Sequence, residues 1–243
     1  MADRDDGQLV SGYRMVPVDP AASRFRHRMG GIDCDAAPLC TVCDRALRAY
    51  VLLDLSDPRL GIEADRRTLP VFYCHNCETP ADLFAYRIAP NGSIQILRQY
   101  RGEPFDGWPQ PRGKFGIELT PVPDRLNEIL LRCPEGWFAY KYSGPRGRAE
   151  PRSDWEADIE FMEGYDLGPF GPSGRAGFHQ LGGLPFWLQQ PQEVTCPSCS
   201  QPMPFLLSLG SDERLGWVFG DWGRLYVFRC SPCSVVAALL QCG

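Results

Sequence analysis

The chain has 243 residues, 44% hydrophobic and 23% charged, with a formal net charge of −5 and a sequence pI of about 5.3. This composition is typical of a soluble globular protein long enough to bury a sizeable core. The acidic balance argues against a nucleic-acid binder, which usually carries a basic face, and apolar runs such as VVAALL at 235–240 are too short to span a bilayer.

The chain begins with a polar stretch and continues with short strand-like runs. Residues 1–22 show no sustained periodicity, so we expect a weakly ordered leader, and without an apolar signal-type run we expect a cytoplasmic location. The runs LFAYRI (83–88) and SIQILRQ (93–99) flank the turn signal Pro90-Asn91-Gly92, which predicts a β-hairpin. Further strands are predicted at 136–142, 158–163, 205–209, 225–229 and 235–241.

One helix is predicted, at 123–133. Its apolar residues Leu126, Ile129 and Leu130 fall at positions i, i+3 and i+4, and Asp124 is placed to cap its N-terminus. A turn-rich, charged segment at 144–154 reads as an exposed loop. The sequence as a whole therefore predicts a mainly β (α+β) fold.

The chain also repeats itself. LPVFYCHNC begins at residue 69 and LYVFRCSPC at residue 225, HRMGG (27–31) matches HQLGG (179–183), and RLGI (59–62) matches RLGW (214–217). Matched segments in the same order predict an internal duplication. We expect a first repeat at 24–100, a non-repeated insert at 101–174 and a second repeat at 175–243, packed into one compact, pseudo-symmetric β domain.

The cysteines are the most faithfully repeated residues. In each repeat a Cys-x-x-Cys pair is followed by 30 residues and then a second such pair. Two such turns bring four sulfurs around one ion, with Zn–S bonds of about 2.3 Å, and four thiolates leave no open coordination position. We therefore expect two structural Zn²⁺ ions in zinc-ribbon-like knuckle pairs, with the ligands Cys40, Cys43, Cys74 and Cys77 in the first repeat and Cys196, Cys199, Cys230 and Cys233 in the second.

The cysteine pattern allows other interpretations. A thioredoxin-type dithiol needs a single motif in a βαβ context, and disulfides need an oxidising compartment, so both are less favoured than metal. The knuckles of the two repeats could instead exchange partners, which the sequence leaves open. Cys34, Cys133 and Cys242 lie outside the pattern and are interpreted as incidental thiols.

A few other residues attract attention. His27 and His179 occupy equivalent places before the double glycines, and we expect each imidazole to fix the local turn by hydrogen bonding to the backbone. The proline-flanked aromatic residues Trp108, Phe186 and Trp187 are candidate anchors for a protein partner, although core packing explains them equally well. No triad order, paired carboxylates or HExxH motif stands out, so no catalytic residue is predicted.

A family resemblance rests on the second repeat. HQLGGLPFWLQ (179–189), CPSCSQPMPFLLSL (196–209) and GDWGRLYVFRCSPC (220–233) resemble the bacterial YwqG-like proteins and their eukaryotic relatives of the programmed-cell-death protein two and Tsr-four type. The first repeat matches in degenerate form, because GGIDCD stands where the family has a proline and a tryptophan after its glycines. The resemblance implies a β-rich, duplicated fold without established catalysis, and a chaperone role toward a ribosomal protein among the eukaryotic members.

These observations predict a non-enzymatic, zinc-stabilised protein-binding module, with a protein client of ribosomal-protein type implied by the resemblance. One alternative is an immunity protein that neutralises a toxin. A second is an RNA-binding or RNA-processing zinc-ribbon protein, in which the arginine clusters at 24–28 and 146–148 would contact RNA in a salt-dependent way.

Overall fold

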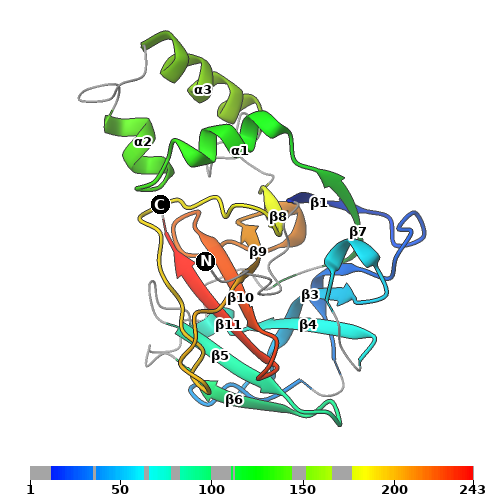
Figure 1. Ribbon diagram of the computed structural model, residues 1–243. Coiled ribbons are helices and arrows are strands. Elements are labelled where there is room, and N and C mark those ends of the chain that lie inside the picture. Colours follow the sequence, from blue (N-terminus) through cyan, green and yellow to red (C-terminus); the bar gives the residue numbers. More distant parts are fainter. Residues whose placement is uncertain are drawn as a thin grey trace.

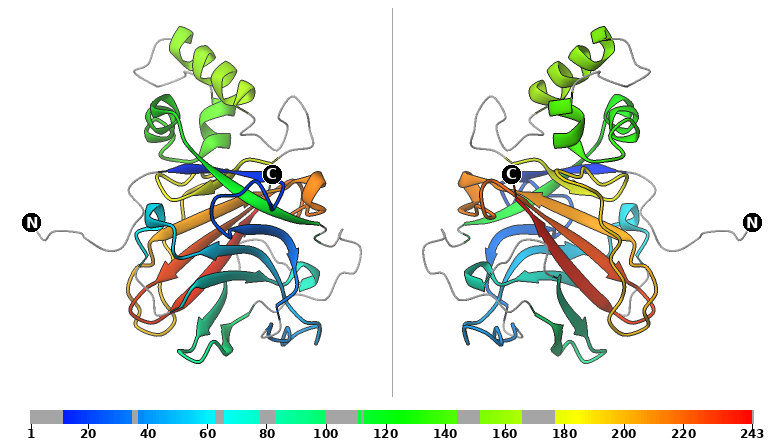
Figure 2. Two further views of the ribbon diagram at one scale, coloured as in Figure 1. Left: turned by 90° about the vertical axis from the view of Figure 1, so that its right-hand side faces the viewer. Right: turned by 90° about the vertical axis from the view of Figure 1, so that its left-hand side faces the viewer.

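The computed structural model describes residues 12–34, 37–62, 66–77, 83–99, 111, 113–143, 152–165 and 177–242. A curled β-sheet forms most of this part of the molecule, and three helices lie together at one end of it (Figures 1 and 2). None of the helices in the described ranges is long and apolar enough to cross a bilayer. The mainly β (α+β) class expected from the sequence is confirmed.

The sheet contains eleven described strands, all paired antiparallel, in the spatial order β4-β3-β2-β7-β1-β8-β9-β10-β11-β5-β6. Their bounds are β1 Tyr13–Val18, β2 Arg28–Ile32, β3 Arg48–Asp54, β4 Thr68–Tyr73, β5 Leu83–Ile88, β6 Ile94–Arg98, β7 Lys114–Pro121, β8 His179–Leu181, β9 Phe205–Gly210, β10 Arg224–Cys230 and β11 Val235–Gln241. We call this sheet the β body. Single 3-10 turns lie at Pro58–Leu60, His75–Cys77 and Glu213–Leu215.

The strand order reflects the sequence repeat. The first repeat supplies β2, β3 and β4 in succession, and the second supplies β8, β9, β10 and β11. The strands β7 and β1 pair with each other and join β2 to β8. Equivalent strands therefore follow one another outward from a central β7–β1 pair, which supports the predicted duplication.

Strand β1 lies within the segment that sequence analysis assigned to a weakly ordered leader. It is hydrogen-bonded to β7 along its whole length and to β8 at Tyr13 and Arg14. The leader interpretation is therefore wrong for Tyr13–Val18, because this segment pairs with two strands and Met15 is buried.

The hairpin predicted at 83–99 is confirmed as β5 and β6. It does not extend the sheet of its own repeat, because β5 pairs with β11 of the second repeat. The Tyr86 side chain still connects β5 to β4: its hydroxyl accepts the Phe72 N–H at 3.1 Å and donates to the Pro70 carbonyl at 2.6 Å. The predicted strands at 205–209, 225–229 and 235–241 are confirmed as β9, β10 and β11.

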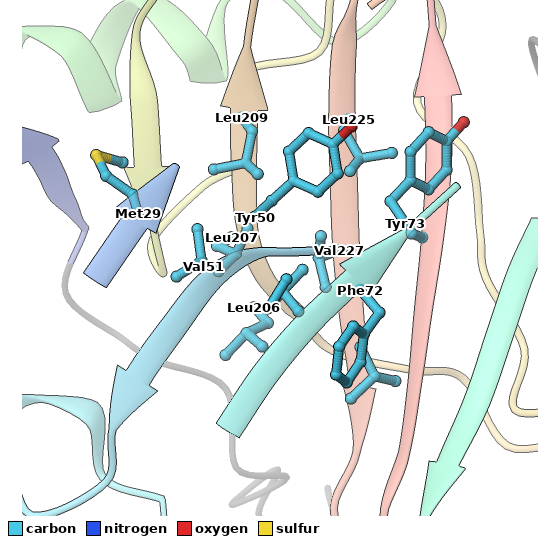
Figure 3. Close-up of a cluster of buried hydrophobic side chains, with 14 of the residues drawn as sticks. Met29, Tyr50, Val51, Phe72, Tyr73, Leu206, Leu207, Leu209, Leu225 and Val227 are labelled. Carbon is cyan, nitrogen blue, oxygen red and sulfur yellow. The ribbon is translucent and has the colours of Figure 1, made fainter. Parts of the chain in front are cut away.

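The main core lies where the curled sheet packs on itself. Tyr50 and Val51 of β3 and Phe72 and Tyr73 of β4 face leucine and valine side chains of β9 and β10 (Figure 3). The Tyr50 ring stacks on Trp217 at 5.1 Å between centroids. Because both repeats contribute to this buried apolar surface, neither would keep its core if it were separated from the other.

The described part of the insert adds α1 Asp124–Leu131, α2 Trp137–Ser143 and α3 Arg152–Gly164, which we call the helical layer. The predicted helix is confirmed as α1, but its N-cap is Pro123 without a side-chain hydrogen bond. Asp124 instead occupies the first turn, where its charge favours the helix dipole. Arg132, at the end of α1, forms an ion pair of 2.6 Å with the buried Asp158 of α3, and Tyr140 of α2 donates to the same carboxylate at 2.7 Å.

The strands predicted at 136–142 and 158–163 are wrong, because both segments are helical. Trp137 and Tyr140 are buried three residues apart, and Asp158 and Met162 four residues apart, which is helical spacing. Windows of six or seven residues with several aromatic and apolar side chains also fit a strand. The start of α3 at Arg152 lies inside the stretch assigned to a loop, so the longer helical period was missed.

Candidate metal centres

Each cluster begins with a tight turn that presents two cysteines. In the first repeat, the Cys40 N–H donates to the Arg45 carbonyl at 2.8 Å and the Asp44 N–H donates to the Cys40 carbonyl at 3.0 Å. Asp44 has a positive φ of 55°, which closes the turn. The N–H groups of Val42 and Cys43 lie 3.4 Å from the Cys40 sulfur, so the backbone supports a thiolate there.

The second repeat builds the same turn from different residues. The Cys196 N–H donates to the Gln201 carbonyl at 2.8 Å, and Ser200, with a φ of 59°, donates its N–H to the Cys196 carbonyl at 2.8 Å. The Ser198 N–H lies 3.4 Å from the Cys196 sulfur. The geometry is thus specified by the Cys-x-x-Cys spacing and by a residue that accepts positive φ.

The remaining two cysteines of each cluster follow a strand of the main core. Cys74 and Cys77 come directly after β4, whereas Cys230 is the last residue of β10 and Cys233 lies between β10 and β11. Since β4 and β10 are equivalent strands, pairing in the sheet fixes where these sulfurs lie relative to the first turn.

The eight expected ligands form two groups of four sulfurs. Within each group the sulfurs lie within 4.8 Å of one another: Cys40, Cys43, Cys74 and Cys77 form the first cluster, and Cys196, Cys199, Cys230 and Cys233 the second. The knuckles therefore pair within each repeat, and the exchanged arrangement that the sequence left open is not adopted.

The sulfur spacing fits a metal ion. The separations are 3.8 Å for Cys40–Cys77, 3.7 Å for Cys43–Cys74 and 3.8 Å for Cys199–Cys230. A tetrahedron with Zn–S bonds of about 2.3 Å has edges of about 3.8 Å, whereas a disulfide requires about 2.05 Å. Both clusters could therefore hold a tetrahedral ion, and both match zinc in size and donor type.

The thiols of each cluster differ in how readily they ionise. Burial raises the pKa of Cys40, but the N–H groups of Cys43 and Val42 and the Gln99 amide outweigh it and lower this pKa to about 7. In the same way the N–H groups of Ser198 and Cys199 outweigh burial and lower the pKa of Cys196 to about 7. Burial and neighbouring cysteines raise the pKa of Cys77 and of Cys230 to about 12. A divalent cation would relieve the repulsion that disfavours several adjacent thiolates.

Gln99, which follows β6, adds a contact to the first cluster that sequence analysis missed. Its amide N–H donates to the Cys40 sulfur at 2.6 Å, and its amide oxygen accepts from the Thr41 N–H at 3.0 Å and from the Thr41 hydroxyl at 2.6 Å. No sequence pattern marks this residue, because the contact depends on where the β5–β6 hairpin packs.

The two expected histidines are buried and hydrogen-bonded. The His27 Nε2 atom lies 2.9 Å from the Asp57 carboxylate, and its Nδ1 atom accepts the Asp54 N–H at 2.9 Å. The His179 Nε2 atom lies 3.2 Å from Asp212. The expected role in a local turn is therefore wrong: each imidazole connects segments that lie 27 to 33 residues apart in the sequence, and in the described contacts only His27 bonds to a backbone group.

Each of the two aspartates that bond to these histidines also pairs with an arginine, so a His–Asp–Arg arrangement occurs in both repeats. Asp57 also pairs with Arg59, and Asp212 with Arg214, each at 2.6 Å. Burial opposes ionisation, but the arginine and histidine contacts hold the pKa of both carboxyls below their usual range. The sequence feature that could have identified these aspartates is the acidic residue shortly before RLG in each repeat.

The three aromatic residues proposed as anchors for a protein partner differ in their surroundings. Phe186 is fully buried, with its ring 6.0 Å from Trp137 of the helical layer, so it is a core residue and not an anchor. Trp187 is half-buried and stacks on Tyr226 at 4.4 Å. Trp108 lies outside the described residues. Cys34, Cys133 and Cys242 lie outside both clusters, as expected.

Comparison with known proteins adds one local similarity. No family model matches the chain. Over 64 residues, 26% of its length, the chain is 39% identical to the uncharacterized protein YpfL of Salmonella typhimurium, and the match covers 15% of that protein. The resemblance to the YwqG-like proteins therefore stays a prediction.

Proposed function

We propose that this chain is a non-enzymatic protein-binding module whose β body is held together by two structural zinc ions. The observation that supports the metal is the pair of four-sulfur clusters with separations of 3.7–3.8 Å. A tetrahedral four-thiolate set is typical of zinc or iron, and zinc needs no redox partner.

The absence of catalysis is proposed from the same chemistry. Four thiolates fill the coordination sphere of zinc, so no position is left for a water or substrate. The imidazoles of His27 and His179 are at most 1% exposed and engaged with aspartates, which removes two residues suited to general acid–base work. Metal and histidine thus both support stability.

The proposed binding surface is the helical layer. Leu131 and Tyr142 are 69% and 70% exposed there, and an open groove of about 440 Å³ is lined by Arg125, Ala157, Glu160, Phe161, Gly164 and Tyr165. Exposed apolar side chains and an open groove on the same layer suit a segment of another protein. The net charge of −5 suits a basic client, as the family resemblance implies.

Metal analysis tests the first half of this proposal. Protein purified without chelator should contain two zinc ions per chain by inductively coupled plasma mass spectrometry, and chelation should abolish its cooperative thermal transition. A metal-free protein that unfolds cooperatively with reduced thiols would contradict the structural role.

Affinity capture followed by mass spectrometry tests the second half. We expect one reproducible protein partner that is lost with Leu131→Ser and with Tyr142→Ser. Leu39→Ser is the matched control, because Leu39 is a similarly exposed apolar residue, at 59%, that lies outside the helical layer, in the turn before Cys40. A partner retained by both helical-layer variants, or lost only with the control, would contradict the proposed surface.

A further inference from the structure

The two clusters differ in how far their sulfurs are shielded. Cys199 is exposed and Cys233 half-buried, whereas their equivalents in the first repeat are the half-buried Cys43 and the fully buried Cys77. Thiolate oxidation follows exposure and thiolate character, so an oxidant in solution reaches the second cluster first.

Contacts around the clusters reinforce this difference. In the first cluster, Gln99 lies against both Cys40 and Thr41, which closes that turn with the end of the β5–β6 hairpin. In the second, Ser198 and Ser231, each between two ligands, accept hydrogen bonds of 2.7 Å from Arg87 and Arg229. Both guanidinium groups bond to serine hydroxyls, and the Cys199 side chain stays exposed.

We infer that the second cluster is the exchangeable, peroxide-sensitive metal site, with Cys199 and Cys233 as its points of oxidation, whereas the first cluster retains its ion. This inference rests on the proposed zinc occupancy. It assigns unequal roles to two sites that the sequence repeat presents as equals.

The chemistry needs only a peroxide. The Cys199 thiolate attacks hydrogen peroxide, the O–O bond breaks, and the sulfur becomes a sulfenic acid as hydroxide leaves. The Cys233 thiolate, which belongs to the same four-sulfur group, then attacks the sulfenic sulfur, forms the S–S bond and expels a second hydroxide. A Zn²⁺ ion held by this cluster would thereby lose two of its four ligands, Cys199 and Cys233, and would dissociate.

Zinc release from the intact protein tests this order. The holo-protein is treated with hydrogen peroxide, free zinc is followed with a chromogenic chelator, and oxidised cysteines are mapped by differential alkylation and peptide mass spectrometry. We expect one zinc equivalent to leave on the order of tenfold faster than the other, together with oxidation of Cys199 and Cys233. Simultaneous release of both ions, or earlier oxidation of Cys43 and Cys77, would overturn the inference.

Two variants sharpen the test. Cys199→His keeps a four-ligand zinc site but removes the exposed thiolate. The fast phase of zinc release should therefore slow to the rate of the slow phase. Gln99→Ala should accelerate only the slow phase, by roughly tenfold. A fast phase that Cys199→His leaves unchanged contradicts the inference, and peptide mapping of the unmodified protein decides the matter should that variant not fold.

The zinc content before peroxide is added separates the two proposals. A chain without zinc refutes the proposed metal and this inference with it. Two ions that leave in the wrong order refute the inference alone.

Discussion

The two four-cysteine clusters are made by the same turn but lie in different surroundings. Cys40, Cys74 and Cys77 belong to the main core, which both repeats build. Cys196 and Cys230 belong to a smaller core on β9, β10 and β11, to which β5 contributes Ala85. Local sequence thus determines the shape of a knuckle, while the surrounding sheet determines how much of the fold depends on it.

The largest expected effect is the loss of stability when a buried cysteine ligand of either cluster is replaced. Cys74→Ser and Cys230→Ser should each lose one zinc ion and on the order of 5 kcal/mol of unfolding free energy, because the binding energy of a structural metal is folding energy. Since Cys74 adjoins the main core, we expect its loss to abolish the cooperative transition, whereas Cys230→Ser keeps one at a lower midpoint. Calorimetry with zinc analysis checks both, and equal loss of cooperativity would refute the distinction.

The second largest loss of stability is expected from replacing the buried aspartates Asp57 and Asp212. Asp57→Asn and Asp212→Asn should each cost about 3 kcal/mol, because a buried ion pair loses one partner. We expect the larger loss for Asp212→Asn, since His27 keeps its second hydrogen bond to the Asp54 N–H, whereas the His179 Nδ1 atom has no partner in the described part of the chain. Urea unfolding of the two variants compares them directly, and a larger loss for Asp57→Asn would contradict this ranking.

Tyr86 connects the displaced strand β5 to its own repeat. Tyr86→Phe should cost about 2 kcal/mol, because the buried Phe72 N–H and Pro70 carbonyl lose their hydrogen-bond partner. Hydrogen exchange should quicken at Phe72 of β4 while β10 stays protected. Uniform acceleration across both repeats would show that the effect is not local.

The smallest expected effect is a pH dependence at His179. Burial lowers the pKa of His179 below its ordinary value of 6.5, so the unfolded chain takes up this proton first as the pH falls. Stability from this group is therefore full above about pH 6.5 and declines below it, by at most about 1.4 kcal/mol per pH unit. Urea unfolding between pH 7.5 and 5.5 should show a shallower decline for His179→Gln, and an unchanged slope would contradict this origin.

The repeat made much of this structure predictable from sequence. The cysteine spacing identified both four-cysteine clusters, and the Pro-Asn-Gly turn identified the β5–β6 hairpin, because each depends on a short sequence motif. The place of β5 beside β11 was not predictable, since it depends on packing between distant segments. The helices at Trp137–Ser143 and Arg152–Gly164 were missed because short aromatic runs fit either period.

The pairing of β5 with β11 has a consequence for synthesis of the chain. The ribosome produces the β5–β6 hairpin long before it produces Val235–Gln241, the strand on which that hairpin docks. At typical translation rates the interval is roughly ten seconds, during which one side of β5 offers unsatisfied backbone groups to any other strand in reach. Newly made copies are therefore most prone to mispair in this interval, and a holding factor that shields Leu83–Ile88 would reduce that loss.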